Sequence, residues 1–304
     1  MNVLSLFDGM SCGQIALEKA GIKVDNYFAS EIEKPAIEVT MKNYPNTKQV
    51  GDVTKVKAET LPNIDLLIGG SPCQGFSFAG KQLNFDDPRS SLFFEYVRLL
   101  KECKPKYFLL ENVKMKKEHQ DVITNYLGVE PILINSARLT AHDRKRLYWT
   151  NIPNIQQPAD SGIYLKDVLD IDTDDNLYLR PEIAERYNAT ENYNSKPEKS
   201  CVIGKLSKYQ GDRIFDVNCK ASSLSASGGN NGGGGCNIIH DPKTNKLRKL
   251  SVTECEKLQG VPSGYMNGFK PNAMYKALGN GWTVDVIAHI FTQLRHRVKY
   301  CCER

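Results

Sequence analysis

The sequence lacks the cysteine pattern of a zinc-binding or disulfide-stabilised protein. It has 9 cysteines in 304 residues, an odd number, and no two of them have CxxC spacing. Such a pattern indicates neither a disulfide framework nor a zinc ribbon. We therefore expect reduced thiols, a cytoplasmic location and no bound metal ion.

Long hydrophobic runs and a strong charge imbalance are also missing. No apolar run is long enough to cross a bilayer, so we expect no membrane partner and no signal peptide. The net charge of +5 permits a polyanionic partner without requiring one. The 304 residues are enough for one large α/β domain and a smaller inserted one.

The glycine spacing GxGxxG of dinucleotide-binding proteins is a third absence. A strand-like run over residues 2–7 leads into a glycine-containing turn at 8–13, and a helical pattern follows over 15–20. A strand, a glycine turn and a helix in this order open a nucleotide-type binding domain. Without the GxGxxG spacing, a pyrophosphate need not be the ligand.

Two acidic residues follow the next two strand-like runs. Glu31 ends the run 27–30, and Asp52 ends the run 50–51. A carboxylate at the position of Glu31 binds ribose hydroxyls in such folds, and a carboxylate at the position of Asp52 can accept a hydrogen bond from an adenine amino group. Solvated strand-end carboxylates are the alternative. Together the two predict a nucleoside site without a phosphate loop, which suits S-adenosylmethionine because it contains no phosphate.

The stretch 70–77, with the sequence GSPCQGFS, follows a buried strand predicted over 64–68. Its Cys73 lies on a Pro- and Gly-rich turn, at the place where open α/β sheets bind ligands. A thiolate there is a reachable nucleophile, whereas the alternative is a small apolar cysteine packed at a strand end. The residues that follow, 75–91, have no clear period and predict a mobile loop.

Residues suited to chemistry recur at the ends of the predicted strands. A further strand is predicted over 107–110, with Glu111 at its end. The carboxyl ends of parallel strands meet at one edge of a sheet. We therefore expect five side chains to gather there: Asp8, Glu31, Asp52, Cys73 and Glu111.

Basic residues alternate in a segment predicted to be extended, 142–149, which follows a predicted strand at 132–135. Alternation would place Arg144 and Arg146 on one face. Two guanidinium groups on one face suit contact with a phosphate or a substrate. A solvated edge strand is the alternative.

The composition changes over 153–247, which is rich in Asn, Ser, Gly, Asp and Pro. We interpret it as an inserted small domain, mostly irregular with short strands, with a flexible loop in the glycine-rich run 222–235. A capping box at 251–254 predicts a short helix through 258, residues 274–282 predict a turn, and 284–294 predict a last helix. Residues 1–152 and 248–304 would form one large domain around the insert.

Taken in order, these motifs resemble the DNA (cytosine-5)-methyltransferases over nearly the whole chain. The matches are F-D-G at 7–9, Glu31, Asp52, S-P-C-Q at 71–74, E-N-V at 111–113, H-D-R-K-R at 142–146, a late motif at 248–262 containing L-Q-G-V-P, and L-G-N at 278–280. His142 replaces the family's usual Gln, and Gly281 stands where the final motif has Ser. The sequences of the first and last motifs are most similar to those of compact phage, bacterial and de novo type members.

The resemblance implies an α/β, Rossmann-like, S-adenosylmethionine-dependent methyltransferase fold, with a mostly parallel sheet flanked by helices and a small target-recognition domain inserted. The implied catalytic residues are Cys73, Glu111, Arg144 and Arg146. The implied cofactor-binding residues are Phe7, Asp8, Gly9, Gly13, Glu31, Ile32, Asp52, Val53, Pro72, Asn280, Gly281 and Trp282. The implied DNA-binding residues are Gln74, Ser77, Arg89, Arg213, Ser225, Gly228 and Gly229.

The resemblance also implies the reaction, which is methyl transfer from S-adenosylmethionine to C5 of a cytosine flipped out of double-stranded DNA. Cys73 would bond to C6, Glu111 would hold N3 and the exocyclic amine, and Arg146, helped by Arg144, would contact the O2 side or a neighbouring phosphate. The product would be S-adenosylhomocysteine.

We expect a monomer in a bacterial or phage-infected cell, a setting that a companion restriction enzyme would fit. Two alternatives stay open. One is a tRNA cytosine-5 methyltransferase of the same fold, and the other is a catalytically silent DNA-binding homologue.

Overall fold

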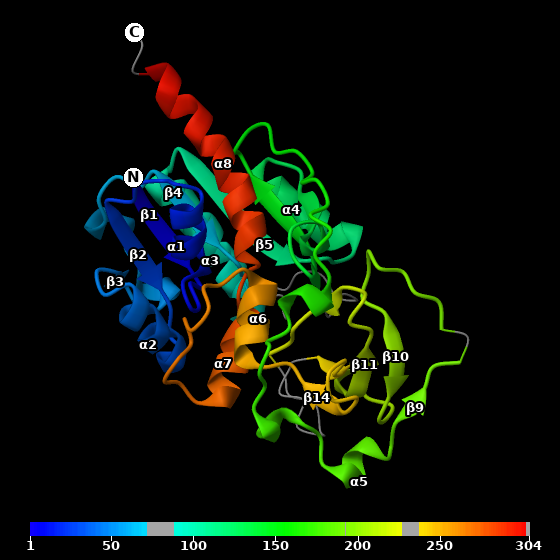
Figure 1. Cartoon of the computed structure of the whole chain (residues 1–304). Coiled ribbons are helices and arrows are strands. Elements are labelled where there is room, and N and C mark those ends of the chain that lie inside the picture. The colour runs from blue at the N-terminus through cyan, green and yellow to red at the C-terminus, as the bar shows by residue number, and fades with distance from the viewer. Residues whose placement is uncertain (72–87, 192, 227–236, 302–304) are drawn as a thin grey trace. The chain divides into compact units, whose positions relative to one another are not determined.

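The computed structural model describes residues 1–71, 88–191, 193–226 and 237–301, with only the backbone described at 88–90, 210 and 296–301. The chain forms two compact units (Figure 1). The first comprises Met1–Ile134, Lys145–Gln157 and Ile287–Arg304, and the second comprises Asn135–Arg144 and Pro158–Val286. The functional division predicted from the sequence, 1–152 with 248–304 around the insert 153–247, stays a prediction.

A seven-stranded sheet with the order β3-β2-β1-β4-β5-β8-β6 forms the centre of the first unit. The first five strands pair in parallel, and β8 pairs antiparallel with β5. The strands are β1 (Asn2–Leu6), β2 (Asn26–Ser30), β3 (Lys48–Gln49), β4 (Leu66–Gly69), β5 (Tyr107–Val113), β6 (Ile132–Asn135) and β8 (Lys145–Thr150). The strand order reverses between β1 and β4, so the loops that leave these two strands lie at a topological switch point, where such sheets bind ligands.

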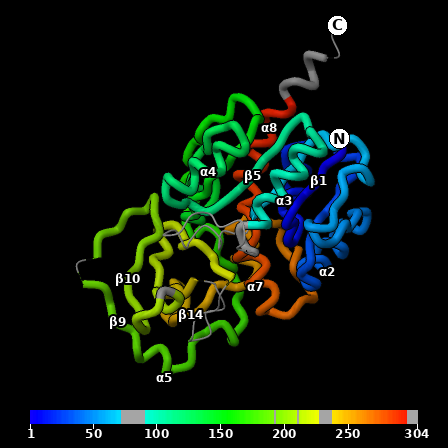
Figure 2. The backbone as a smooth tube through the Cα atoms, turned by 180° about the vertical axis from the view of Figure 1, so that it is seen from behind, coloured from blue at the N-terminus to red at the C-terminus, as the bar shows by residue number. Residues whose placement is uncertain are grey.

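Helices lie on both sides of this sheet (Figures 1 and 2). They are α1 (Cys12–Lys19), α2 (Lys34–Asn43), α3 (Pro88–Cys103), α4 (Lys117–Leu127) and α8 (Val284–Cys301), with 3₁₀ turns at Val53–Lys55 and Ala58–Thr60. Buried side chains of α3 and α4, among them Phe93 and Leu127, share one hydrophobic core with Leu4, Leu67 and Trp149 of the strands. The mostly parallel, helix-flanked sheet predicted from the resemblance is confirmed.

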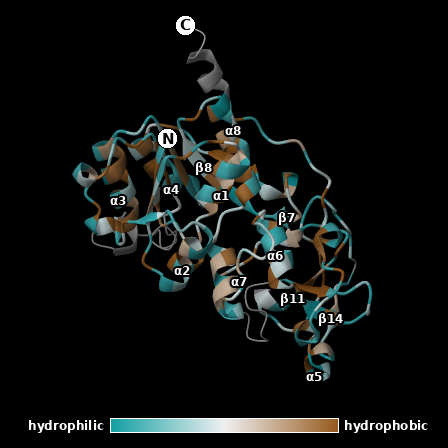
Figure 3. Cartoon of the chain, turned by 60° about the vertical axis from the view of Figure 1, so that its left-hand side comes forward, coloured by the Kyte–Doolittle hydropathy of each residue, from teal (hydrophilic) through white to brown (hydrophobic). Residues whose placement is uncertain are grey.

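The second unit is built from short strands and loops. Its five-stranded sheet has the order β14-β13-β11-β10-β9, and a separate parallel pair joins β7 to β12. These strands are β7 (His142–Asp143), β9 (Asn188–Ala189), β10 (Val202–Lys205), β11 (Arg213–Phe215), β12 (Ala221–Ser222), β13 (Ile238–His240) and β14 (Leu247–Lys249). Leu206, Ile214, Ile238 and Leu247 form the sheet's core, and the hydrophobic colour in this unit gathers on the short strands (Figure 3).

The helical segments of the second unit are short. They are α5 (Pro181–Ala184), α6 (Val252–Gln259) and α7 (Pro271–Asn280), with 3₁₀ turns at Ser136–Arg138, Leu165–Val168, Asp175–Leu177 and Gln210–Asp212. The mixture of irregular chain and short strands that the composition predicts for 153–247 is confirmed over the described residues 153–191, 193–226 and 237–247. None of the helices in the described ranges is long and apolar enough to cross a membrane.

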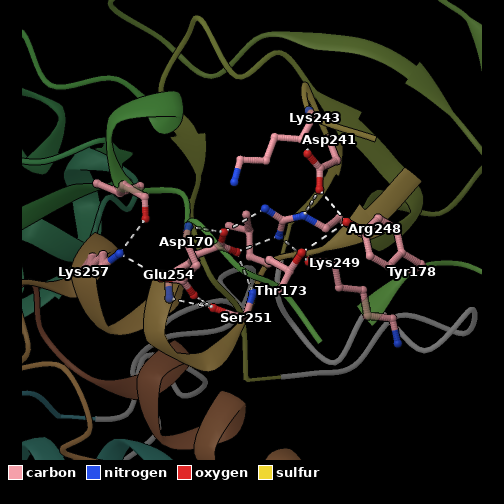
Figure 4. A network of polar contacts seen from close by, with 12 residues as sticks. Asp170, Thr173, Tyr178, Asp241, Lys243, Arg248, Lys249, Ser251, Glu254 and Lys257 are labelled. Carbon is pink, nitrogen blue, oxygen red and sulfur yellow. Dashed lines mark hydrogen bonds and ion pairs between the residues drawn. The ribbon is translucent and has the colours of Figure 1, made fainter. Parts of the chain in front are cut away.

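A buried network of charges connects β14 to α6 (Figure 4). The Arg248 guanidinium donates to both carboxylate oxygens of Glu254 at 2.8 Å and to Asp241 at 2.9 Å. Glu254 also accepts from the Ser251 backbone N–H, while the Ser251 hydroxyl accepts from the Glu254 N–H. These two reciprocal bonds form the predicted capping box, which is therefore confirmed as the start of α6.

The turn predicted over 274–282 is wrong for its first seven residues, which belong to helix α7. Pro271 stands in the first turn of α7, where its fixed φ favours a helix. Gly279 lies within α7, and its lack of a side chain lets the backbone of Ser225 approach, since a Cβ there would lie 2.4 Å from the carbonyl carbon of Ser225. A glycine near a helix end therefore reflects a close backbone contact here, and not the start of a turn.

The last helix, α8, is confirmed and is longer than predicted, ending at Cys301. Val286, Ile287, Ile290 and Phe291, expected on its apolar face, are fully buried. Residues from Ile287 onward belong to the first unit. From Ile287 on, the last helix therefore shares a unit with the chain's first residues.

Candidate active site

The loop after β1 has an unusual backbone. Phe7, Gly9 and Ser11 have positive φ angles of 57°, 59° and 65°. Such a φ is uncommon for a bulky residue such as Phe, so the surrounding structure must hold it. Within this loop Asp8 accepts a hydrogen bond from the Tyr27 hydroxyl at 2.7 Å. Burial raises the pKa of Asp8, and the nearby charge of Glu31 adds to this rise. Hydrogen bonds from Ser5, Tyr27 and Ser11 offset part of the rise, and the resulting pKa is about 6.

Glu31 ties this loop to the chain that follows β2. One of its carboxylate oxygens accepts from Gly9 N at 2.8 Å, and the other accepts from Ile32 N at 2.7 Å and Glu33 N at 2.8 Å. Each carboxylate oxygen has two acceptor sites, so the group can still accept from a ligand hydroxyl. Beside it, the Ile32 side chain is 72% exposed, an unusual position for a large apolar residue.

Asp52 begins the 3₁₀ turn Val53–Lys55. Its carboxylate accepts from the backbone N–H of Thr54 at 3.0 Å and from the Thr54 hydroxyl at 2.9 Å, and these bonds lower the pKa of Asp52. The Ser30 hydroxyl donates to Gly51 O at 2.7 Å, which links the end of β2 to this turn. The loops after β1, β2 and β3 are therefore joined at one edge of the sheet.

Three of the residues named as cofactor contacts, Gly9, Gly13 and Val53, differ in their surroundings. A Cβ at Gly9 or Gly51 would meet nothing within 4 Å, so there is open space beside the loops after β1 and β3. Gly13 in α1 and Val53 are buried instead.

Glu111 forms an ion pair with Arg146 across two antiparallel strands. Arg146 Nε lies 3.0 Å from Glu111 Oε1, with side-chain exposures of 16% and 11%. Glu111 is opposite Tyr148 in the register, so Arg146 is its diagonal neighbour on the same face. The sequence predicts that Glu111 follows the end of its strand, and this is wrong. Glu111 lies within β5, which continues to Val113 because β8 supplies a partner for these residues.

Asn112, the next residue, anchors the end of the chain that leaves β4. Its side-chain amide donates to Ser71 O at 3.2 Å and to Ser71 Oγ at 3.3 Å, and both residues are buried. The sequence alone gives Asn112 no separate role. The feature that could have indicated this contact is the parallel pairing of β4 with β5. Gly69 pairs with Leu110, so Ser71 and Asn112, each two residues further along its strand direction, lie opposite one another.

Several expected site residues fall outside what the structure describes. Pro72, Cys73, Gln74 and Ser77 lie in 72–87, Gly228 and Gly229 lie in 227–236, and the side chain of Arg89 is not described. Among the others, Arg213 is half-buried at the start of β11, and Ser225 and Asn280 are exposed. Gly281 and Trp282 are partly exposed in the turn after α7.

Arg144 has a different environment from Arg146. The single extended segment predicted for 142–149 is wrong, because the chain leaves the β7–β12 pair at Arg144 before it enters the seven-stranded sheet at Lys145. Arg144 is only 4% exposed. Its two terminal nitrogens donate to Ser223 Oγ, Leu224 O, Gly279 O and Gly281 O at 3.0–3.3 Å.

Comparison with known proteins assigns this arrangement to a family. The family model for C-5 cytosine-specific DNA methylases matches residues 1–296. The chain belongs to this family. Type II methyltransferase M.HhaI of Haemophilus parahaemolyticus is 31% identical to this methylase over 311 residues, covering 95% of this chain and 93% of the relative. Type II methyltransferase M1.ScrFI of Lactococcus lactis is 30% identical, covering 94% and 75%.

Solved structures share the fold of this methylase at low sequence identity. The methyltransferase EhMeth of Entamoeba histolytica matches with a TM-score of 0.76 and 17% identity over 98% of each chain. The Dnmt2 methyltransferase of S. pombe matches with a TM-score of 0.69 and 17% identity, covering 98% of this chain and 99% of its own. The resemblance, the fold class and the enzyme class predicted from the motifs are confirmed. Membership of the family implies S-adenosylmethionine and DNA in general terms.

Proposed function

We propose that this methylase transfers a methyl group from S-adenosylmethionine to C5 of a flipped-out cytosine in double-stranded DNA, with Cys73 as the nucleophile. The observation that carries the proposal is the Glu111–Arg146 pair, which stands next to the anchor between Asn112 and Ser71. Cys73 itself lies outside the described residues, so its part in the proposal comes from the S-P-C-Q motif at 71–74.

The residues present suit the chemistry that cytosine needs. C5 of cytosine is a poor nucleophile, and a bond from the Cys73 sulfur to C6 moves electron density to C5, which then takes the methyl group. Loss of the C5 proton to water and breakage of the sulfur–C6 bond restore the aromatic ring. Glu111 would hold N3 and the exocyclic amine, and Arg146 would orient Glu111 and contact the O2 side.

The loops at the sheet edge fit S-adenosylmethionine. When bound, this donor supplies an electrophilic methyl group on a sulfonium. Glu31 would accept from the ribose hydroxyls, Asp52 would accept from the adenine amino group, and the exposed Ile32 would cover a face of the adenine. The open space beside Gly9 and Gly51 leaves room for the group. The further cofactor contacts proposed are Phe7, Asp8, Gly13, Val53, Pro72, Asn280, Gly281 and Trp282.

DNA recognition would fall to the insert 153–247, where short strands carry long loops. Arg213 at the start of β11, Ser225, Gly228 and Gly229 would contact the target, and Gln74, Ser77 and Arg89 would contact it from the segment around Cys73. The Type II methyltransferases among the relatives support a DNA substrate and a restriction-modification setting in the bacterial cytoplasm.

Methylation of mixed-sequence duplex DNA, followed by bisulfite sequencing, tests the proposal. We expect 5-methylcytosine within one short recurring sequence. Cys73→Ala should lower the rate by at least about 10³-fold and change DNA affinity by less than about 3-fold. Cys103→Ala, which removes a half-buried thiol of α3, is the matched control and should keep the wild-type rate. A Cys73→Ala protein with the wild-type rate would rule out the mechanism.

Two further assays separate the alternatives. Duplex DNA carrying 5-fluorocytosine should form a denaturation-resistant adduct with the wild type and none with Cys73→Ala, because fluorine cannot leave C5 as a proton does. Transfer to tRNA at a rate above that on any DNA would favour the tRNA enzyme. A folded wild type that binds DNA and methylates neither nucleic acid would favour a silent homologue.

A further inference from the structure

The segment Ser223–Ser225, which lies at the start of the run 222–235, is held by two side chains of one short stretch, His142 and Arg144. The Leu224 backbone N–H donates to His142 Nε2 at 3.0 Å, and the Leu224 carbonyl accepts from Arg144 Nη1 at 3.1 Å. The backbone N–H and the backbone carbonyl of Leu224 therefore both form hydrogen bonds to side chains about 80 residues away in the sequence. His142 is fully buried, and its Nε2 must be unprotonated to accept.

The other terminal nitrogen of Arg144 holds the end of α7. Nη2 donates to Gly279 O at 3.1 Å and to Gly281 O at 3.0 Å. The last carbonyls of a helix lack partners within the helix and carry partial negative charge, so a guanidinium is well suited to this place. One buried cation therefore connects Ser223 and Leu224 to the turn Gly279–Gly281.

The two segments are also in direct backbone contact. A Cβ on Gly279 would lie 2.4 Å from the Ser225 carbonyl carbon and 2.7 Å from Ala226 N. Well-packed backbones of this kind cannot shift independently. A displacement of the turn after α7 must therefore also move Ser225 and Ala226.

We propose that Arg144 is a positioning residue that couples the cofactor turn, Gly279–Trp282, to the DNA-recognition segment, Ser223–Ala226, with His142 fixing the backbone of Leu224. This inference rests on the function proposed above. It replaces the catalytic part given to Arg144 from the sequence, because contact with a substrate would cost the guanidinium its four hydrogen bonds. Its consequence is reciprocal: S-adenosylhomocysteine tightens DNA binding, and DNA tightens S-adenosylhomocysteine binding by the same factor.

The test compares DNA affinity with and without saturating S-adenosylhomocysteine, by fluorescence anisotropy on a duplex carrying the sequence found by bisulfite mapping. We expect about a 10-fold tightening for the wild type and less than about 2-fold for Arg144→Lys, which keeps the charge but cannot reach all four acceptors. Arg138→Gln is the matched control, because Arg138 also donates to a backbone carbonyl, that of Pro158, without touching either segment. It should keep the 10-fold effect.

Kinetics distinguish positioning from catalysis. For Arg144→Lys we expect KM for DNA to rise about 10-fold while kcat at saturation falls less than about 3-fold; a 100-fold fall in kcat would restore the catalytic role and overturn the proposal. His142→Gln keeps a carbonyl acceptor for Leu224 N–H and should stay within about 2-fold of the wild type, whereas His142→Leu should raise KM like Arg144→Lys. Equal behaviour of the two His142 variants would also count against the proposal.

Hydrogen exchange on the free protein covers the case in which Arg144→Lys folds poorly. Faster exchange in both 222–226 and 279–282, with the rest of the second unit unchanged, is expected for Arg144→Lys, and faster exchange in 222–226 alone for His142→Leu. Unchanged exchange in either segment of Arg144→Lys would overturn the coupling. A wild type that methylates DNA but shows no coupling defeats this inference alone, whereas a wild type without methylation on any duplex defeats the proposed function and this inference together.

Discussion

Two arginine–glutamate pairs, one in each unit, show how differently the same chemistry is used in this molecule. In the first unit, Arg146 meets Glu111 through one contact of 3.0 Å, and both side chains keep some exposure, 16% and 11%. In the second unit, Arg248 meets Glu254 through two contacts of 2.8 Å, and the exposures are 1% and 0%.

The difference lies in what each carboxylate has left to offer. Glu254 accepts from Arg248, from Ser251 N and from Asp170 N, so its oxygens are occupied within the fold. Among the described residues, Glu111 is held by one arginine nitrogen, and its side chain remains in reach of solvent. A buried and fully bonded pair specifies a structure, while a pair with unused acceptor capacity suits a substrate that brings its own donors.

The largest expected effect is on activity at the incompletely bonded pair. Glu111→Gln keeps the shape of the side chain and removes its charge, so kcat should fall by about 10³-fold while the free energy of unfolding changes by less than about 1 kcal/mol. Methylation kinetics and urea titration measure the two quantities. Glu118→Gln, on an exposed carboxylate of α4, should change neither. A Glu111→Gln enzyme with an intact kcat would remove the distinction between the pairs.

The next effect is on stability at the fully bonded pair. Arg248→Met leaves Glu254 and Asp241 buried without their cation, which should lower the free energy of unfolding by about 3–5 kcal/mol. The protein that remains folded should keep kcat within a few fold. Urea titration followed by the intrinsic fluorescence of the tryptophans gives the first number. A loss below 1 kcal/mol would show that the network is not a structural one.

Asp8 extends the comparison to a carboxyl that receives hydrogen bonds from hydroxyl groups instead of from an arginine. Its pKa is raised from 3.8 to about 6, so the folded state loses stability as the pH rises through this window and reaches its full penalty above it. Asp8→Asn removes the penalty. It should stabilise the protein by up to about 3 kcal/mol at pH 8 and by almost nothing near pH 4. Thermal unfolding of both proteins across pH 4–8 measures the difference, and a pH-independent difference would contradict it.

The smallest effect is expected at a pair on the surface. Arg98 contacts Glu102 at 2.8 Å along α3, but Glu102 is 42% exposed. Glu102→Ala should therefore change the free energy of unfolding by no more than about 0.5 kcal/mol, and less at high salt. Denaturant titration at two ionic strengths tests this. A cost near that of Arg248→Met would mean that exposure does not separate structural from superficial pairs.

The sequence predicted well what depends on local pattern. The strands that precede Asp8, Glu31 and Cys73, the capping box at Ser251 and the apolar face of α8 follow from periodicity and short motifs. It predicted poorly what depends on distant partners. β5 is longer than its apolar run because β8 pairs with it, and Gly279, expected in a turn, is instead a helical residue of α7 whose missing side chain makes room for the backbone of Ser225.

The two arginines of the H-D-R-K-R motif illustrate the same limit. Their spacing suggests the same role for both, but only the partners tell them apart, and those of Arg144 are 79–137 residues away along the chain. No periodicity carries that information. Asn112 went unnoticed for the same reason, since its partner Ser71 belongs to another strand.

The bonds from His142 and Arg144 to Leu224 bear on attempts to give this protein a new target sequence. A graft of residues 153–247 from a relative would import a new recognition segment. It would leave behind the relative's own side chains at 142 and 144, which are the positions that bind the backbone of Leu224 in this protein. Such chimaeras should work best when the donor's residues at 142–144 travel with the graft, so the unit of exchange is larger than the inserted domain itself.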